Sequence, residues 1–172
     1  MKNRVTIELA KENDLEYLPD VERSAARKFI EYLKLNEGNF SKTLDQNILK
    51  QSLSNKSLWV ARNNADIIGF LASRTFDKFI HIDELSVSFE FQGMGIGRKF
   101  LDVLNEKAAD DGIQELTLTT DKLIPWNFPY YQRLGFSEVD MEECPHFLKE
   151  ILTRDKNANP VPENRVAMTK KL

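Results

Sequence analysis

Three glycines alternate in the segment QGMGIGR, at Gly93, Gly95 and Gly97. Glycines at every second position weaken a strand or a helix, so they indicate a backbone that bends sharply or lies very close to a ligand. The preceding residues 79–87 alternate like a strand, and an apolar pattern of helical spacing follows. A strand, a glycine-rich turn and a helix together favour phosphate binding, because the first N–H groups of the helix and its dipole face the anion. We expect Arg98 to add a charge-assisted contact.

Two common nucleotide-binding motifs do not fit this segment. A dinucleotide fingerprint has the form G-x-G-x-x-G. Its third glycine would fall on Arg98 if the motif began at Gly93, and on Phe100 if it began at Gly95. A P-loop needs G-K-[ST] at the start of the helix, and the sequence has no such triplet there. The glycines therefore indicate a different phosphate ligand.

The sequence around the glycines resembles the pyrophosphate loop of the GNAT N-acetyltransferase superfamily. In that superfamily the pattern Q/R-x-x-G-x-G/A follows a strand, and here QGMGIGR closely follows ELSV. The segment YYQRLGF at residues 130–136 resembles the Y-x-x-x-G-F segment of the same family, in the expected order along the chain. The runs TTDKLIPWNFPYYQRLGF, ERSAARKF and ENRVAMTKKL are similar to a bacterial branch of the family, so the resemblance covers essentially the whole chain.

This resemblance implies an α/β (α+β) fold, in which a single GNAT-type domain over residues 1–172 has a mixed, splayed central sheet flanked by helices. It also implies acetyl-CoA as co-substrate: the glycine loop would bind the pyrophosphate, and the main chain of the preceding strand would pair with the pantetheine arm and stabilise an oxyanion. Asn127 is a further candidate, although it lies four residues before Tyr131, where many family members have an asparagine seven residues before the tyrosine. The acetyl-CoA-binding residues predicted in this way are Leu85, Ser86, Val87, Gln92, Gly93, Met94, Gly95, Ile96, Gly97, Arg98 and Asn127.

The implied reaction moves an acetyl group from a thioester to an amine. A free alkylamine has a pKa near ~10.4, so a base must remove its proton before it can attack. The segment HIDEL offers three candidates, and we expect Glu84 to be the base or to position a water, with Asp83 as the second candidate and His81 as the third. Simple alternation along a strand places Asp83 and Glu84 on opposite faces, unless a bulge changes which one faces the site.

The thiolate of CoA leaves more easily if it receives a proton. Tyr131 can donate one if it reaches the sulfur, and Tyr130 is the neighbouring alternative. Trp126 is predicted to form a wall of the acceptor pocket, with packing in the core as a nearly equal alternative.

Composition narrows the class of partner. There are 24 Lys and Arg residues against 27 Asp and Glu, a net charge of −3, which argues against a nucleic-acid-binding protein. The single Cys144 excludes an internal disulfide and a cysteine-based zinc site, and we expect no metal. The sequence has no apolar run long enough to span a bilayer and no signal-peptide pattern at its start, so we expect a cytoplasmic protein without a membrane partner.

The acceptor is expected to be a primary amine of a small molecule or a peptide. Acetylation of protein N-termini or lysines is an alternative within the same chemistry. A non-catalytic acyl-CoA-binding sensor is an alternative from another class, and the presence of both an acidic residue on the donor strand and Tyr131 argues against it. A homodimer is common in the family.

These residues need a framework of alternating strands and helices. The expected order is β-α-α-β-β-β-α-β-α-β-α-β, within one domain. Asn13 or Asp14 is predicted to cap the first helix, with Pro19 marking a break or a new start, and a Ser or Thr is predicted to cap the second. Strands are predicted at 4–9, 79–87, 113–121, after Gly135 and at 165–172, and a hairpin is predicted at 57–76 with its turn at Asn63-Asn64. Helices are predicted at 12–33, 41–53, 97–112, before Gly135 and at 145–155. Loops are predicted at Gly38-Asn39 and 157–164.

Overall fold

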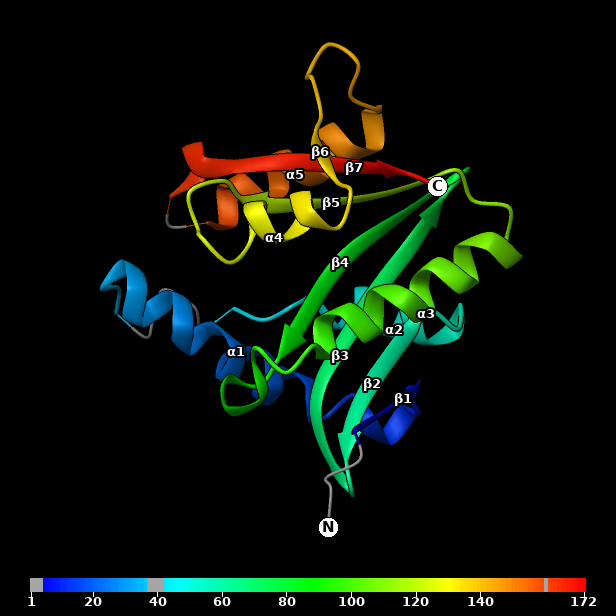
Figure 1. Cartoon of the computed structure of the whole chain (residues 1–172), viewed down its shortest axis with the longest axis vertical. Coiled ribbons are helices and arrows are strands. Elements are labelled where there is room, and N and C mark those ends of the chain that lie inside the picture. The colour runs from blue at the N-terminus through cyan, green and yellow to red at the C-terminus, as the bar shows by residue number, and fades with distance from the viewer. Residues whose placement is uncertain (1–4, 37–41, 160) are drawn as a thin grey trace. The chain divides into compact units, whose positions relative to one another are not determined.

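The computed structural model describes residues 5–36, 42–159 and 161–172. Within those ranges the strands and α-helices follow the order predicted from the sequence (Figure 1). The predicted loop at Gly38-Asn39 lies outside the described residues. The strands are β1 (Val5–Leu9), β2 (Leu58–Asn63), β3 (Asp66–Phe76), β4 (Phe79–Val87), β5 (Glu115–Asp121), β6 (Ser137–Glu138) and β7 (Arg165–Lys171). The α-helices are α1 (Leu18–Leu33), α2 (Gln46–Ser54), α3 (Ile96–Asp110), α4 (Phe128–Arg133) and α5 (His146–Ala158), and short 3-10 helices lie at η1 (Glu12–Asp14), η3 (Phe89–Phe91) and η4 (Pro162–Asn164).

The strands described form one mixed sheet in the order β1-β2-β3-β4-β5-β7-β6. The pairs β1–β2, β2–β3, β5–β7 and β6–β7 are antiparallel, whereas β4 and β5 are parallel where residues 79–82 face residues 115–118. A mixed α/β fold with helices flanking the sheet was predicted from the sequence and is confirmed. The splay expected in this sheet stays a prediction.

The chain divides into two compact units. Unit 1 comprises Met1–Arg74 and Asp83–Lys107, and unit 2 comprises Thr75–Ile82 and Ala108–Leu172. Strand β4 contributes its first four residues to unit 2 and its last five to unit 1. The glycine loop and both carboxylates of HIDEL therefore belong to unit 1, and the YYQRLGF segment belongs to unit 2.

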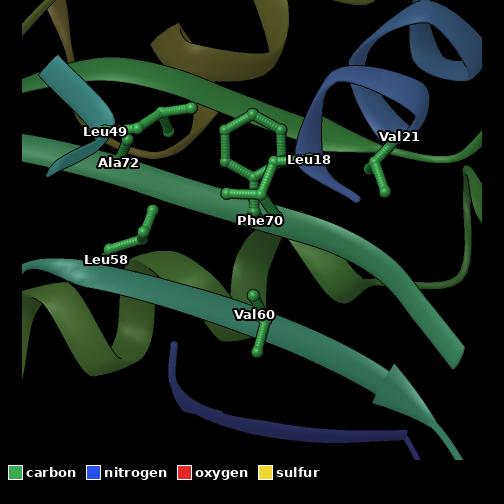
Figure 2. Close-up of a cluster of buried hydrophobic side chains, with 7 residues drawn as sticks. All are labelled: Leu18, Val21, Leu49, Leu58, Val60, Phe70 and Ala72. Atoms are coloured by element: carbon green, nitrogen blue, oxygen red, sulfur yellow. The ribbon is translucent and has the colours of Figure 1, made fainter. Parts of the chain in front are cut away.

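The core of unit 1 lies between two helices and the β2–β3 hairpin (Figure 2). The hairpin forms because Asn64 adopts a left-handed conformation at the predicted turn, with φ at 57°. Phe70 of β3 is fully buried among side chains from α1, α2 and β2, and burying each such side chain contributes about 1.5–3 kcal/mol. The cluster comprises Leu18, Val21, Leu49, Leu58, Val60, Phe70 and Ala72.

The caps of the first two helices differ from the predicted ones. Helix α1 begins at Leu18 with Pro19 in its first turn, so the alternative of a new start at the proline is correct. Asp14 does not cap α1, because its carboxylate accepts a hydrogen bond from the N–H of Lys11 and forms an ion pair with Arg62. Helix α2 is capped by Asp45, which accepts the N–H of Asn47 at 2.7 Å, and not by the predicted Ser or Thr.

Unit 2 is built on the antiparallel pair β5–β7, which aligns residues 115–121 with 165–171 (Figure 1). Its hydrophobic cluster joins α5 to β7 through Cys144, Leu148, Leu152 and Ala167. Helix α5 extends to Ala158, three residues beyond the predicted end. Among the residues that the structure describes, no helix is long and apolar enough to cross a membrane.

Candidate active site

The glycine loop turns the chain sharply between β4 and α3. Gly93 and Gly95 have φ of 78° and 77°, in the left-handed region that favours glycine. A Cβ added to either residue would meet no described heavy atom within 4 Å. Glycine is therefore needed at these two positions for the backbone conformation and not for space inside the protein.

Gln92 fixes the start of this loop. Its Nε2 donates to the carbonyl oxygens of Ala25 in α1 and Val87 at the end of β4, at 3.2 and 3.0 Å. One residue earlier on α1, the hydroxyl of Ser24 accepts the N–H of Phe89 at 3.1 Å. The Gln92 side chain therefore ties the loop to α1, and its predicted contact with acetyl-CoA stays a prediction.

The start of α3 presents main-chain donors on an exposed surface. The N–H of Lys99 donates to the carbonyl of Gly95 at 3.2 Å, which opens the helical pattern, so the N–H groups before it point out of the helix end. Met94 and Arg98 are exposed, and Ile96 is only 2% exposed and anchors the helix in the core. This arrangement provides the N–H groups, the helix dipole and a cation that a pyrophosphate requires.

Asp83 and Glu84 are neighbours on β4 but have different partners. The carboxylate of Asp83 binds Nε and Nη2 of Arg74 at 2.8 and 2.6 Å, and its side chain is fully buried. Glu84 accepts a hydrogen bond from the hydroxyl of Ser86 at 2.7 Å, two residues further along the strand. Asp83 is thus held in an ion pair with Arg74, whereas Glu84 binds a hydroxyl group, and the role of either residue as the base stays a prediction.

The charge of Glu84 acts on a second carboxylate, Glu22 of α1. Both of its oxygens accept the N–H of Leu44, at 3.1 and 2.9 Å. Burial and then the charge of Glu84 raise the pKa of Glu22 from 4.5 to about 8, against smaller lowering effects of the Leu44 hydrogen bond and of Arg23. Sequence reasoning missed Glu22. The available signal was its spacing, since it follows Leu18 by four residues and falls within the apolar stripe of α1.

Tyr131 lies in unit 2, on the short helix α4. Its ring is half-buried and makes edge contacts with Tyr130 and Phe136, with centroids 5.3 and 5.7 Å apart. The N–H of Phe136 donates to the carbonyl of Tyr131 at 3.0 Å, which closes the turn at Gly135, where φ is 92°. The YYQRLGF segment therefore forms a compact turn that fixes the orientation of the tyrosine.

Two other predicted site residues of unit 2, Trp126 and Asn127, lie close to this helix in the sequence. Asn127 is the N-cap residue of α4, and its carbonyl accepts the N–H of Tyr131 at 3.0 Å. Trp126 precedes it and is half-buried. His81, the third candidate for the base, belongs to unit 2 through β4; it is 1% exposed and its Nδ1 lies 2.9 Å from the hydroxyl of Thr117.

Neither cysteine nor metal chemistry is indicated in the described ranges. Burial raises the pKa of the Cys144 thiol, which packs against α5 and β7 as a small apolar residue. Among the described side chains, no group of three or more His, Cys, Asp or Glu residues is arranged to hold a metal ion.

Comparisons with known proteins show the family and the fold. Residues 18–149 match the family model described as the acetyltransferase (GNAT) domain, which is well over half of the chain. Among solved structures, the chain is similar to PaiA N-acetyltransferase of Thermoplasma acidophilum in complex with coenzyme A, with 19% identity, 98% of this chain and 99% of that chain covered and a TM-score of 0.69. It is also similar to a GNAT family acetyltransferase of Elizabethkingia anophelis with acetyl-CoA bound, with 22% identity, 100% of both chains covered and a TM-score of 0.66. A third similar structure is the ribosomal-protein-S18-alanine N-acetyltransferase of Escherichia coli, with 16% identity, 98% and 94% covered and a TM-score of 0.63.

The chain belongs to the GNAT acetyltransferase family. The enzyme class predicted from the sequence, an acetyltransferase that uses acetyl-CoA, is confirmed by this match. The solved structures share its fold along almost their whole length.

Proposed function

We propose that this protein transfers the acetyl group of acetyl-CoA to a primary amine of a small molecule or a peptide, by direct attack within a ternary complex. The observation that carries the proposal is the order of two features along the chain from β4 to the start of α3. Glu84, which is bonded to Ser86, lies only a few residues before an exposed glycine loop at the start of α3. A base and an anion-binding turn on one continuous segment are what this reaction requires.

In this proposal the glycine loop binds the pyrophosphate through the N–H groups of residues 93–98 and the side chain of Arg98. The main chain of Leu85, Ser86 and Val87 pairs with the pantetheine arm and stabilises the oxyanion.

Glu84 accepts a proton from the acceptor amine, directly or through a water. The nitrogen then attacks the acetyl carbon, and the C–S bond breaks with its electron pair passing to the sulfur. Tyr131 donates a proton to that sulfur, with Tyr130 as the alternative. Asp83 keeps a positioning role, because Arg74 already neutralises its charge.

The acceptor side includes Trp126 as a pocket wall, and Asn127 contributes to CoA binding. Residues 1–172 work as one N-acetyltransferase domain in the cytoplasm, either as a monomer or as a homodimer. The Escherichia coli structure is named for a protein acceptor, which keeps acetylation of a protein N-terminus as the alternative to a small amine.

The test combines binding and turnover. We would measure acetyl-CoA binding by calorimetry and follow free thiol release with a panel of primary amines and amine-bearing peptides. Glu84→Gln and Tyr131→Phe should retain acetyl-CoA binding and each lose turnover, by about 10²–10⁴-fold for the base. Binding without thiol release across the whole panel would favour a sensor, and the absence of binding would overturn the assignment of the glycine loop.

A further inference from the structure

The short segment between β4 and the glycine loop is fastened to helix α1. The hydroxyl of Ser24 accepts the N–H of Phe89 at 3.1 Å. The guanidinium carbon of Arg27 lies 4.5 Å from the centre of the Phe89 ring, and the same side chain forms an ion pair with Glu90 at 3.1 Å. Ser24 and Arg27 are three residues apart, so they lie on one face of α1, and this face supports the segment.

Gln92 ends this segment, and its N–H donors are used inside unit 1. Its main-chain N–H donates to the carbonyl of Phe89 at 3.3 Å. Its side-chain amide has two N–H donors, and Nε2 donates to the carbonyls of Ala25 and Val87 at 3.2 and 3.0 Å. With these donors used, the side chain keeps only its acceptor, Oε1, for a further partner. A phosphate oxygen needs a donor, so this geometry is unfavourable for a direct contact between Gln92 and a pyrophosphate.

The hydrogen bonding of the main chain changes immediately after Gln92. The N–H groups of residues 93–98 form no main-chain hydrogen bond in the described part of the chain, and the next such bond is that of Lys99 to Gly95 at 3.2 Å. Gln92 is therefore the last residue that the protein holds before the donors become open. Open donors bind an anion well only if their directions are fixed beforehand, because ordering a loop during binding reduces the affinity.

We propose that Gln92 is a positioning residue of the acetyl-CoA site, which fixes the first open N–H groups of the glycine loop through α1, in place of the direct contact predicted from the sequence. The inference rests on the proposed function, in which this loop binds the pyrophosphate. Helix α1 is a firm support, because Leu18 and Val21 pack in the core of unit 1. Ser24 assists by holding the N–H of Phe89, three residues before Gln92.

The first test compares two acetyl donors, because S-acetylpantetheine has the thioester and the pantetheine arm of acetyl-CoA but no pyrophosphate. Gln92→Met keeps a side chain of similar length and removes both amide donors. It should lower kcat/KM with acetyl-CoA about tenfold, through KM and not kcat, and change kcat/KM with S-acetylpantetheine less than about twofold. Gln51→Met, at an exposed position of α2, is the matched control and should keep the wild-type values. Equal losses with both donors would overturn the inference, because a general structural change does not distinguish them.

The second test separates positioning from direct contact and needs no turnover. Ser24→Ala removes the α1 acceptor of the Phe89 N–H and leaves Gln92 unchanged, so it should weaken acetyl-CoA binding in calorimetry by about threefold or more. The double variant should lose less affinity than the product of the two single losses, since both residues act on one segment. Unchanged affinity in Ser24→Ala, or losses that multiply, would overturn the inference in favour of a direct contact.

The wild-type protein distinguishes failure of the inference from failure of the proposed function. If it uses acetyl-CoA and S-acetylpantetheine with equal kcat/KM, the proposed binding of the pyrophosphate by the glycine loop is wrong, and the inference falls with it. If it prefers acetyl-CoA and Gln92→Met keeps the same preference and affinity, the inference alone is overturned. Thermal unfolding of each variant confirms that the protein compared is folded.

Discussion

Two adjacent carboxylates on β4, Asp83 and Glu84, bind different partners. Asp83 faces Arg74, which binds both of its oxygens within 2.8 Å. Glu84 accepts a hydrogen bond from the Ser86 hydroxyl, and its charge is the second cause, after burial, of the raised pKa of Glu22. The period of two along a strand separates these neighbours, so the two carboxylates of the sequence pair DE have different partners.

On this difference we base the proposal that Asp83 stabilises the fold and that Glu84 is the catalytic base. A buried carboxylate that is neutralised by an arginine holds β3 and β4 together but has little tendency to accept a further proton. A carboxylate next to another carboxylate costs stability, and it is a stronger base for that reason. Variants of each member should therefore differ in which property they change.

The largest effect on stability is expected from Asp83→Asn. This change removes the buried carboxylate from its ion pair with Arg74, and removing one partner of a buried pair costs about 3–5 kcal/mol. Glu84→Gln should not destabilise the protein, because it removes a like-charge contact with Glu22. Urea unfolding of both variants at pH 7.5 measures the two effects. Equal losses of stability in the two variants would contradict the distinction between the carboxylates.

The pH dependence of the free energy of unfolding should reveal the raised pKa of Glu22. The pKa of Glu22 is raised in the folded state from 4.5 to about 8. A group whose pKa is higher in the folded state than in the unfolded state contributes stability that is fully present below the unfolded-state pKa and is lost as the pH rises towards the folded-state pKa. The free energy of unfolding should therefore fall progressively between about pH 4.5 and 8 because of Glu22. The limiting slope is about 1.4 kcal/mol per pH unit.

The control for this measurement is Glu22→Gln, which should flatten the decrease in unfolding free energy over that pH window. Glu31→Gln should leave it unchanged, since this side chain is exposed on the same helix. If the wild type and Glu22→Gln show the same dependence on pH, Glu22 is not protonated at neutral pH in the folded protein.

A smaller effect is expected from Ser86→Ala. The change removes the hydroxyl that orients Glu84, and we expect kcat to fall about tenfold, which corresponds to about 1.4 kcal/mol in the barrier. Ser57→Ala is the matched control, because Ser57 is also buried in unit 1 but donates only to main-chain carbonyls, those of Ser52 and Ser73. Both variants should lose some stability, whereas only Ser86→Ala should lose turnover. A loss of turnover in Ser57→Ala of the same size would indicate that general destabilisation explains both.

Much of this arrangement could be predicted from the sequence, because its signals are local. Strand β4 has the predicted bounds, Phe79–Val87, since its apolar residues alternate between well-defined ends. The β2–β3 turn lies at Asn64, and the glycine loop turns where the glycines require it. The predicted order of strands and helices is confirmed for the same reason.

The parts that could not be predicted depend on contacts between distant residues. Arg74 and Asp83 lie on different strands, and nothing in either strand alone indicates which carboxylate the arginine binds. Glu22 becomes important only through Glu84 and Leu44, which are 62 and 22 residues away in the sequence. The cap of α2 was assigned to a Ser or Thr because several polar residues precede that helix, and only the folded main chain shows that Asp45 occupies the position.

The smallest expected effect, on acetyl-CoA binding, distinguishes a glycine with a structural role from one with a proposed role in binding. The variants of Asp83 and Glu84 make the same distinction for the two carboxylates of β4. Gly95 and Gly112 both have positive φ, 77° and 67°, and a Cβ at either position would meet no described atom within 4 Å. Alanine at either position should cost about 1–2 kcal/mol of stability, because the left-handed conformation is unfavourable for an L-residue. Gly95→Ala should also weaken acetyl-CoA binding, since the added methyl group and any change in φ alter the surface that faces the pyrophosphate. Gly112→Ala, at the end of α3, should leave binding unchanged in calorimetry, and an equal loss of affinity in the two variants would show that the loop makes no specific contact with the ligand.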